Sequence, residues 1–335
     1  MTTIRAIRAG KPAYYPDQAI YAEYAASALG LGFAELDAGT GLIFEVSANG
    51  KRAPFGAGRG SFFSQNTATA ATLANDKHMA NVLMARAGIA TLGGNYFFLH
   101  DRHRAHRAPG HEHEDAYALF RSFGGVAFLK PLNGSRGDFA QLIKDETALT
   151  DYLDQVAAHY DAVIMQQIVT GHEYRVFVLD DEIVYSARKL PALITGDGKR
   201  SLRELLSAQE TVLSHRGISS ATAKQPDAAL DMVLAEGAPF ALTGRMNRSA
   251  GAAMEFAEPT LADDAFATAR KALRALGLRA GAVDLFTHVD GDVSALRIIE
   301  VNANPSIRFL EDSCRDDLIV RIWRHTFTSL GLIDV

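Results

Sequence analysis

The sequence has one cysteine, no long apolar run and no excess of positive charge. The lone cysteine, Cys314, cannot form a disulfide within the chain, which is typical of a reducing compartment. No stretch approaches the roughly 18 apolar residues that a membrane-spanning helix needs, and residues 1–17 lack the apolar centre of a signal peptide. We therefore predict a cytoplasmic protein that does not bind a membrane.

The charge balance argues against a protein that binds nucleic acid. The 335 residues carry a formal net charge of −5, whereas nucleic-acid-binding proteins usually present a basic face. With 48% hydrophobic residues the chain can bury a large core, in two or three lobes at roughly 100–200 residues each. Small molecules are therefore the expected partners, and the sequence leaves open whether the chain forms a homodimer.

The first 74 residues are predicted to mix short strands and helices, with a hairpin turn at Asn49-Gly50. A short helix is predicted to follow, capped by Asn75 and ended by Gly88. Its apolar stripe is expected to consist of Met79, Val82 and Leu83.

From residue 100 onward, helices alternate with strands and antiparallel hairpins. The polar segment 100–115 contains several histidines without a metal-site spacing, which favours a solvated connecting loop. The elements expected after it are helices at 114–123, 146–160 and 263–277, strands at 126–132, 138–143 and 162–169, a hairpin at 173–189 that turns at Asp180-Asp181, a capping box formed by Ser201 and Glu204, two strands at 281–286 and 297–305 joined through Asp290-Gly291, and a closing helix around Trp323. This mixture indicates an α+β fold with more than one lobe.

Two polar side chains interrupt the apolar strand at 297–305. Successive side chains of a strand point to opposite faces, so Ile298, Glu300 and Asn302 are expected on one face. If this strand pairs with the one at 281–286 about a centre near residue 292, Asp284 lies opposite Glu300. Two carboxylates so close repel each other, and a divalent cation removes the conflict. Three oxygen donors favour Mg²⁺, and the alternative is a solvent-facing strand that holds no ion.

The hairpin at 173–189 contains a second conflict of charge. Glu173, Arg175 and Phe177 are expected on one face of its first strand. A turn centred on 181–182 would place Arg188 close to the position opposite Arg175. Two facing arginines cost stability unless an anion such as a phosphate lies between them, and the alternative is a pair of surface arginines.

A lysine and a glycine-rich turn follow one another near residue 130. Lys130 ends an apolar strand, and Gly134, Ser135 and Gly137 form the turn after it. The backbone N–H groups of such a turn can surround an oxyanion, which suits a nucleoside triphosphate. The spacing differs from G-x-x-x-x-G-K-[ST] and excludes a P-loop NTPase, while a hairpin with an exposed lysine is the alternative.

Five segments, taken together and in this order, resemble the ATP-grasp enzymes: NDK…LMARAGI, FLKPLNGSRGD, VIMQQIVTGHEYRVFVLDDEIVYSARKLPALITGDGKRSLREL, GRMNRSAGAA and GAVDLF…RIIEVNANPSI. The likeness runs from about residue 66 to 310 and is strongest at 166–205, towards the ATP-grasp module of cyanophycin synthetase and of bifunctional bacterial glutathione synthetases. It implies an ATP-grasp fold with an N-terminal lobe at 1–99, a lid lobe at 100–170, and a C-terminal lobe at 171–335 that holds an antiparallel sheet and the metal site.

The resemblance also implies roles for individual residues. Lys77 and Lys130 would contact the phosphates of ATP, the loop at 134–137 would fold over them, and Glu173 would bind the ribose. The adenine hinge, which usually begins with Glu in this family, would consist of Gln166, Gln167, Ile168 and Val169. Mg²⁺, as one or two ions that Mn²⁺ can replace, would be held by Asp284, Glu300 and Asn302. The catalytic side chains would be Arg175, Arg188, Asn247 and Arg248, and the substrate would be bound by Arg245 and Arg308, for which surface charge is the alternative.

The implied reaction is an ATP-dependent carboxylate–amine ligation on amino acids or small peptides. The γ-phosphoryl group of ATP would pass to a carboxylate, and an amine would attack the acyl phosphate, releasing ADP and phosphate. Catalysis would depend on positioning and on neutralisation of charge rather than on a protein nucleophile. A kinase that phosphorylates a hydroxyl group and a non-catalytic nucleotide-binding module are the alternatives.

Overall fold

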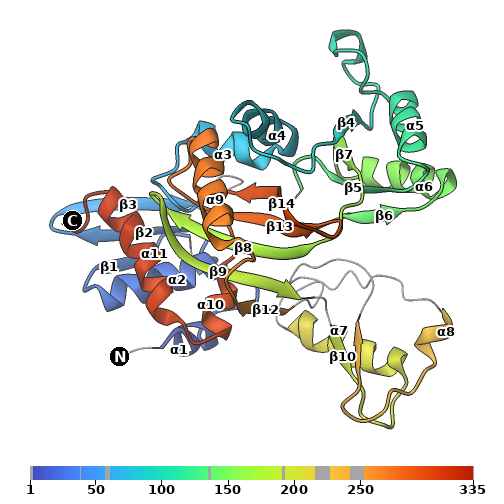
Figure 1. The fold of residues 1–335 in the computed structure, drawn as a ribbon. Helices are drawn as coiled ribbons and strands as arrows, with labels where there is room; N and C mark the ends of the chain where they lie inside the picture. The colour runs from blue at the N-terminus through green and yellow to red at the C-terminus, as the bar shows by residue number, and fades with distance from the viewer. Residues whose placement is uncertain are drawn as a thin grey trace.

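The computed structural model describes residues 3–37, 39–56, 61–134, 137–190, 193–215, 227–241 and 253–334. Its helices and antiparallel sheets form the lobes seen in Figure 1, which confirms the predicted α+β fold. Within the described ranges, no helix has both the length and the apolar character needed to cross a bilayer.

A five-stranded sheet in the order β12-β9-β8-β13-β14 lies at the centre, and all its neighbouring pairs are antiparallel. Its strands are β8 (His172–Leu179), β9 (Glu182–Leu190), β12 (Ala253–Phe256), β13 (Ala280–Val289) and β14 (Asp292–Asn302). Both predicted hairpin turns are confirmed, because Asp180, Asp181, Asp290 and Gly291 all have the positive φ of tight turns.

The two faces of this sheet are covered by different parts of the chain. One face, called the α9 face here, packs Val176, Val283 and Leu285 against α3 (Ala68–Asn75), α4 (Lys77–Arg86) and α9 (Ala262–Leu276). The other face, called the site face, carries Phe177 and Ala282 and packs against the N-terminal lobe and the closing helix. Each strand therefore divides its side chains between two separate cores.

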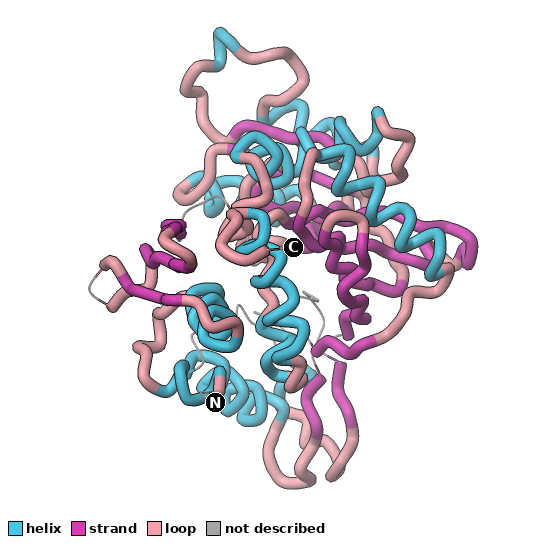
Figure 2. The backbone as a smooth tube through the Cα atoms, turned by 90° about the vertical axis from the view of Figure 1, so that its left-hand side faces the viewer, coloured by secondary structure: helices cyan, strands magenta, loops and turns pink. Residues whose placement is uncertain are grey.

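The N-terminal lobe consists of α1 (Ile4–Ala9), α2 (Asp17–Ala28) and the sheet of β1 (Gly32–Glu35), β2 (Ile43–Ala48) and β3 (Lys51–Gly56). The predicted turn at Asn49-Gly50 joins β2 to β3, and both residues have positive φ. The closing helix α11 (Asp316–Ser329) lies beside α2 and buries Trp323 completely. Figure 2 shows these helices gathered on one side of the central sheet.

The helix α9 forms as its apolar period predicts, with Ala269, Leu273 and Leu276 buried and Gly277 ending it at a positive φ. Phe266, expected inward as well, is partly buried against the same core.

The predictions for α4 were partly wrong. Asp76, not Asn75, caps the helix, since its side chain accepts hydrogen bonds from the backbone of His78 and Met79. Met79 and Val82 are 46% and 51% exposed, while the buried residues are Ala80 and Met84. The inward face is the one that also carries Lys77, because residues 77, 80 and 84 share one side of a helix. Lys77 therefore points inward, where it makes the hydrogen bonds described below.

A four-stranded sheet in the order β4-β7-β5-β6 lies at the upper right of Figure 1, in the region predicted to be the lid lobe. Its strands are β4 (Asn95–Phe98), β5 (Ala127–Pro131), β6 (Gln141–Ile143) and β7 (Ala162–Gln166), covered by α5 (His113–Ser122) and α6 (Glu146–Ala157). The strand β4 precedes residue 100 yet pairs with β7, so the sheet includes residues on both sides of the predicted boundary. The histidine-rich segment lies between β4 and α5 and contains a short 3-10 helix, η1 (Arg104–His106).

A small third unit combines α7 (Leu202–His215), α8 (Asp227–Leu230), β10 (Leu193–Thr195) and β11 (Pro239–Ala241). The predicted capping box is confirmed, because the backbone N–H of Ser201 donates to Glu204 Oε2 and the backbone N–H of Glu204 donates to Ser201 Oγ. A separate cluster of Ile194, Leu202, Leu205 and Leu234 forms the core of this unit.

Candidate active site

The predicted pairing of two acidic residues is confirmed. Asp284 on β13 lies directly opposite Glu300 on β14, and Ala282 lies opposite Asn302. Ile298, which was expected on the same face as Glu300, is instead buried in the core of the α9 face. The register shifts between these positions, because Leu285 pairs with Ile298 and Ile299 becomes an extra residue in the strand. The bulge therefore allows Ile298 to be buried in the core of the α9 face while Glu300 lies on the site face.

The carboxylate of Asp284 is bound by two cations of the chain itself. Arg175 Nε donates to Asp284 Oδ1 and Arg175 Nη2 donates to Oδ2, both at 2.8 Å, and Lys189 Nζ donates to Oδ2 at 2.9 Å. Asp284 is 1% exposed. Its burial acts to raise its pKa, but Arg175 and Lys189 outweigh burial and hold the pKa well below its ordinary range. The predicted repulsion between Asp284 and Glu300 is therefore relieved by Arg175 and Lys189.

Lys189 was missed in the sequence, although it occupies the centre of this cluster. Its ammonium group also donates to Glu173 Oε1, and both side chains are buried. Burial raises the pKa of Glu173 above its ordinary value, against the opposing effect of Lys189. Strand alternation places Lys189 on the same face as Ala187, the residue that pairs with Arg175, but the sequence alone did not reveal that register.

The prediction that Arg188 faces Arg175 was wrong. The turn is centred between Asp180 and Asp181 rather than on 181–182, and Arg188 pairs with Tyr174. Tyr174 belongs to the core of the α9 face, so Arg188 leaves the sheet on the side away from Asp284. There burial lowers the pKa of His172, and Arg188 and His288 lower it further.

Two lysines from other elements approach Glu300. Lys130 on β5 is buried, and its Nζ lies 3.9 Å from Glu300 Oε2. Lys77 at the start of α4 donates from Nζ to the carbonyl oxygens of Leu132 (3.2 Å) and Gly134 (2.8 Å). Burial lowers the pKa of Lys77 to about 8, while the charge of Glu300 opposes this shift. Burial acts to raise the pKa of Glu300, yet Lys130 and Lys77 help to keep it below its ordinary value.

The glycine turn after β5 lies beside these lysines. At Gly134, a Cβ atom would approach Pro131 Cβ to 2.9 Å, and Gly137 has a φ of +69° that side chains disfavour. Both glycines therefore suit a tightly folded turn. Ser135 lies outside the described residues.

The predicted hinge at 166–169 connects the last strand of the lid sheet to β8 of the central sheet. Gln166 is buried, and its Nε2 donates to the carbonyl oxygen of Gly93 at 2.8 Å. Gln167 and Ile168 are exposed and Val169 is half-buried, so the segment crosses between the two sheets at the surface.

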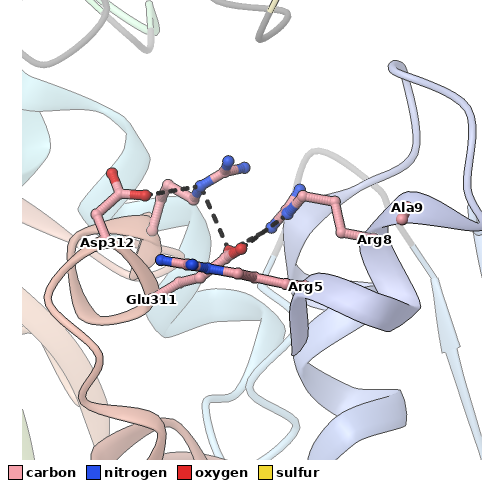
Figure 3. Close-up of a pocket in the computed structure, with 6 residues that line it drawn as sticks. Arg5, Arg8, Ala9, Glu311 and Asp312 are labelled. Atoms are coloured by element: carbon pink, nitrogen blue, oxygen red, sulfur yellow. Dashed lines mark hydrogen bonds and ion pairs between the residues drawn. The ribbon is translucent and has the colours of Figure 1, made fainter. Parts of the chain in front are cut away.

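Arg308 was predicted to bind substrate, and the structure places it on α10 (Arg308–Asp312). Its guanidinium group contacts Asp17 Oδ1 at 3.0 Å, Glu311 Oε2 at 3.3 Å and Asp312 Oδ1 at 3.4 Å. It lines a pocket of about 330 Å³, in which Arg5 and Arg8 of α1 face Glu311 and Asp312 (Figure 3). Arg245, Asn247 and Arg248 lie outside the described residues.

The arrangement combines anion-binding and cation-binding groups in one place. Lys77 and Lys130 supply positive charge, while Glu300 and Asn302 supply oxygen atoms of the kind that Mg²⁺ prefers. The side chain of Asn302 donates weakly to Glu300 Oε1, at 3.4 Å, so the two lie side by side. Phosphate groups and a hard divalent cation are the ligands that such a set can bind together.

No family model matches the chain. The cyanophycin synthetase of Geminocystis herdmanii is 26% identical over 260 residues, which cover 70% of this chain and 28% of that protein. The glutathione biosynthesis bifunctional protein of Listeria monocytogenes is 31% identical over 100 residues, which cover 29% of this chain and 13% of that protein. The chain thus spans less than a third of the length of these curated relatives.

Two solved structures have similar folds. The bifunctional glutathione synthetase of Pasteurella multocida has a TM-score of 0.53 at 17% identity, covering 92% of this chain and 45% of that one. The D-alanine–D-alanine ligase of Bacillus anthracis has a TM-score of 0.51 at 13% identity, covering 79% of this chain and 71% of that one. At such low identity these likenesses establish the fold.

Proposed function

We propose that this chain is an ATP-grasp protein and acts as an ATP-dependent carboxylate–amine ligase, which forms an amide or peptide bond through an acyl phosphate. The observation that carries the proposal is that Lys77 and Lys130 lie close to Glu300, which is beside Asn302 on β14, the last strand in the order of the central sheet. The proposed substrates are amino acids or small peptides, which the name of one structural neighbour, a D-alanine–D-alanine ligase, supports.

The residues present fit a magnesium ion. Glu300 and Asn302 offer oxygen atoms, and Asp284 lies opposite Glu300 on the same face. Among the described residues no three side chains of His, Cys, Asp or Glu gather as a metal site, so the phosphates of ATP would complete the coordination. Bound there, Mg²⁺ would neutralise charge on the transferred phosphoryl group.

The side chains of this chain would act by binding and orienting the reactants. Lys77 and Lys130 would hold the phosphates of ATP, and the turn after β5 would cover them. The hinge at 166–169 would bind adenine through its backbone, and Glu173 would meet the ribose. Arg175 would keep Asp284 in place through its two hydrogen bonds. Asn247, Arg248, Arg245 and Arg308 remain proposed contacts for the substrate.

The reaction proceeds in two displacements. A carboxylate oxygen of the acid substrate attacks the γ-phosphorus, and the bond from that phosphorus to the β–γ bridging oxygen breaks, releasing ADP. The amine nitrogen then attacks the acyl carbon, phosphate leaves with the electron pair of the broken C–O bond, and the nitrogen loses a proton. Neither step needs a nucleophile from the protein, and the positioned cations stabilise the charge that develops.

We expect ADP and phosphate, but no AMP, when purified protein is incubated with Mg²⁺, ATP, and amino acids supplied in pairs as acid and amine. Hydroxylamine in place of the amine should capture the acyl phosphate as a hydroxamate, which a kinase acting on a hydroxyl group would not produce. Chromatography of the nucleotides and a colorimetric hydroxamate assay make the two measurements. Release of AMP and pyrophosphate would show adenylation and contradict the proposed mechanism.

The turn after β5 is expected to become less mobile when nucleotide binds. Lys77 already ties the carbonyl groups of Leu132 and Gly134 to α4, and bound phosphates would give this turn additional partners. Hydrogen exchange of the amides around Leu132 and Gly134 should slow in the presence of Mg-ATP, while amides in the middle of β13 serve as the unaffected reference. Equal exchange with and without nucleotide would argue against a closing lid.

A further inference from the structure

We propose that Lys189 is a positioning residue that keeps Asp284 from binding a divalent cation until nucleotide arrives. This inference rests on the metal site of the proposed function, and it concerns the order in which the cation and the nucleotide bind. Lys189 would occupy the side of Asp284 that the cation needs, and the phosphates of ATP would draw its ammonium group away.

The Asp284 carboxylate is already bound by cations of the chain itself. Both oxygens accept hydrogen bonds, Oδ1 from Arg175 and Oδ2 from Arg175 and Lys189. The residue is almost completely buried and is held between β8 and β14 in the sheet, which leaves it little freedom to turn towards another partner. A cation that coordinates Oδ2 must therefore displace one of these donors.

The balance of charge around the site also favours joint binding of the cation and the nucleotide. The carboxylates of Glu173, Asp284 and Glu300 are matched by three cationic side chains: Arg175, Lys189 and Lys130. A divalent cation that enters without nucleotide brings charge that nothing compensates, and Lys77 nearby increases the repulsion. The phosphates of ATP carry the compensating negative charge, so cation and nucleotide are expected to bind together.

Of the two donors to Asp284, Lys189 rather than Arg175 is the one expected to move. Arg175 binds Asp284 through two parallel hydrogen bonds, an arrangement with strict geometry. Lys189 makes one contact with Asp284 and a second with Glu173, from a flexible four-carbon side chain. When Lys189 leaves Asp284 it can retain Glu173, so its release leaves neither its own charge nor that of Glu173 unpaired.

The test measures Mn²⁺ binding without nucleotide, by the electron paramagnetic resonance signal of free Mn²⁺. Wild type is expected to bind Mn²⁺ weakly, and Lys189→Met to bind it at least about tenfold more tightly, since one unit of opposing charge has been removed. Lys189→Arg, which keeps the charge, should behave as wild type does. Lys199→Met, at an exposed lysine of another lobe, is the matched control and should change nothing.

A second variant guards against misfolding. Lys189→Met leaves Glu173 buried without its cation, so Glu173→Gln/Lys189→Met removes both charges; it should still bind Mn²⁺ more tightly than wild type, because Asp284 Oδ2 has lost its lysine donor. Adding Glu300→Gln to either variant should abolish the gain, which would place the bound ion at this site.

Equal Mn²⁺ affinity in wild type and both Lys189→Met variants would overturn the inference. A wild-type protein without ATP turnover would contradict the proposed ligase function but not this inference, because the binding measurement needs no turnover.

Discussion

Replacing Glu300 by glutamine is expected to reduce ATP turnover by at least about a hundredfold while the protein still folds. The glutamine keeps the size of the side chain but removes an anionic ligand from the proposed cation site, and a bound metal contributes several kcal/mol of charge stabilisation in the transition state. Steady-state release of ADP measures the loss. Glu258→Gln, at an exposed position near the start of α9, is the matched control and should retain full activity.

The stability of this variant distinguishes a functional role from a structural one. The Glu300 side chain is 30% exposed and its ion pair with Lys130 is long, at 3.9 Å, so neutralising it should change the melting temperature only slightly. An inactive protein with a melting curve close to that of wild type supports the cation site. Full activity in Glu300→Gln would contradict it, because the carboxylate would then be an ordinary residue of a partly exposed strand.

Replacing Asp284 by asparagine is expected to lower the free energy of unfolding by about 3–5 kcal/mol. The change removes the negative charge that Arg175 and Lys189 share, and it leaves two cationic groups close together in a buried place. Denaturant unfolding followed by circular dichroism measures the loss. Asp231→Asn is the matched control: its ion pair with Arg203 at 3.2 Å is largely exposed, so a change below about 1 kcal/mol is expected.

Wild type and Asp284→Asn are also expected to differ in how their stability depends on pH. The pKa of Asp284 is lowered in the folded state, so its contribution is fully present above the unfolded value of roughly 3.9 and is lost as the pH falls towards the folded value. Wild type should therefore lose stability below about pH 4 more steeply than Asp284→Asn does, in unfolding curves recorded at successive pH values. Parallel curves for the two proteins would show that the charge of Asp284 contributes nothing.

Local signals in the sequence were sufficient for many elements. The Asp180-Asp181, Asp290-Gly291 and Asn49-Gly50 turns form because these residue types tolerate positive φ, a property of a few neighbouring residues. The helix α9 was predictable for a similar reason, since its apolar residues repeat with the period of a helix. The pairing of Asp284 with Glu300 was also predicted, but the turn alone does not produce it, since two register shifts within the hairpin bring Glu300 opposite Asp284.

Other features of the candidate site depended on contacts between distant parts of the chain. Arg175 and Asp284 are 109 positions apart and meet because β8 and β13 are neighbours in the sheet, an order of strands that no local pattern contains. Lys77 likewise points inward and donates hydrogen bonds to the turn after β5, which belongs to another lobe.

Arg188 and Lys189 show most clearly why the sequence alone did not determine the candidate site. The sequence by itself indicated a cationic residue near the end of β9, and the hairpin turn indicated roughly where it would lie. A displacement of one residue moves a side chain to the opposite face of a strand, and the turn position and the bulge between β8 and β9 decided which of the two reaches Asp284. Alternation of side chains along a strand is a local property. The register, which decides which residues of neighbouring strands lie opposite one another, is set by the packing of the whole sheet.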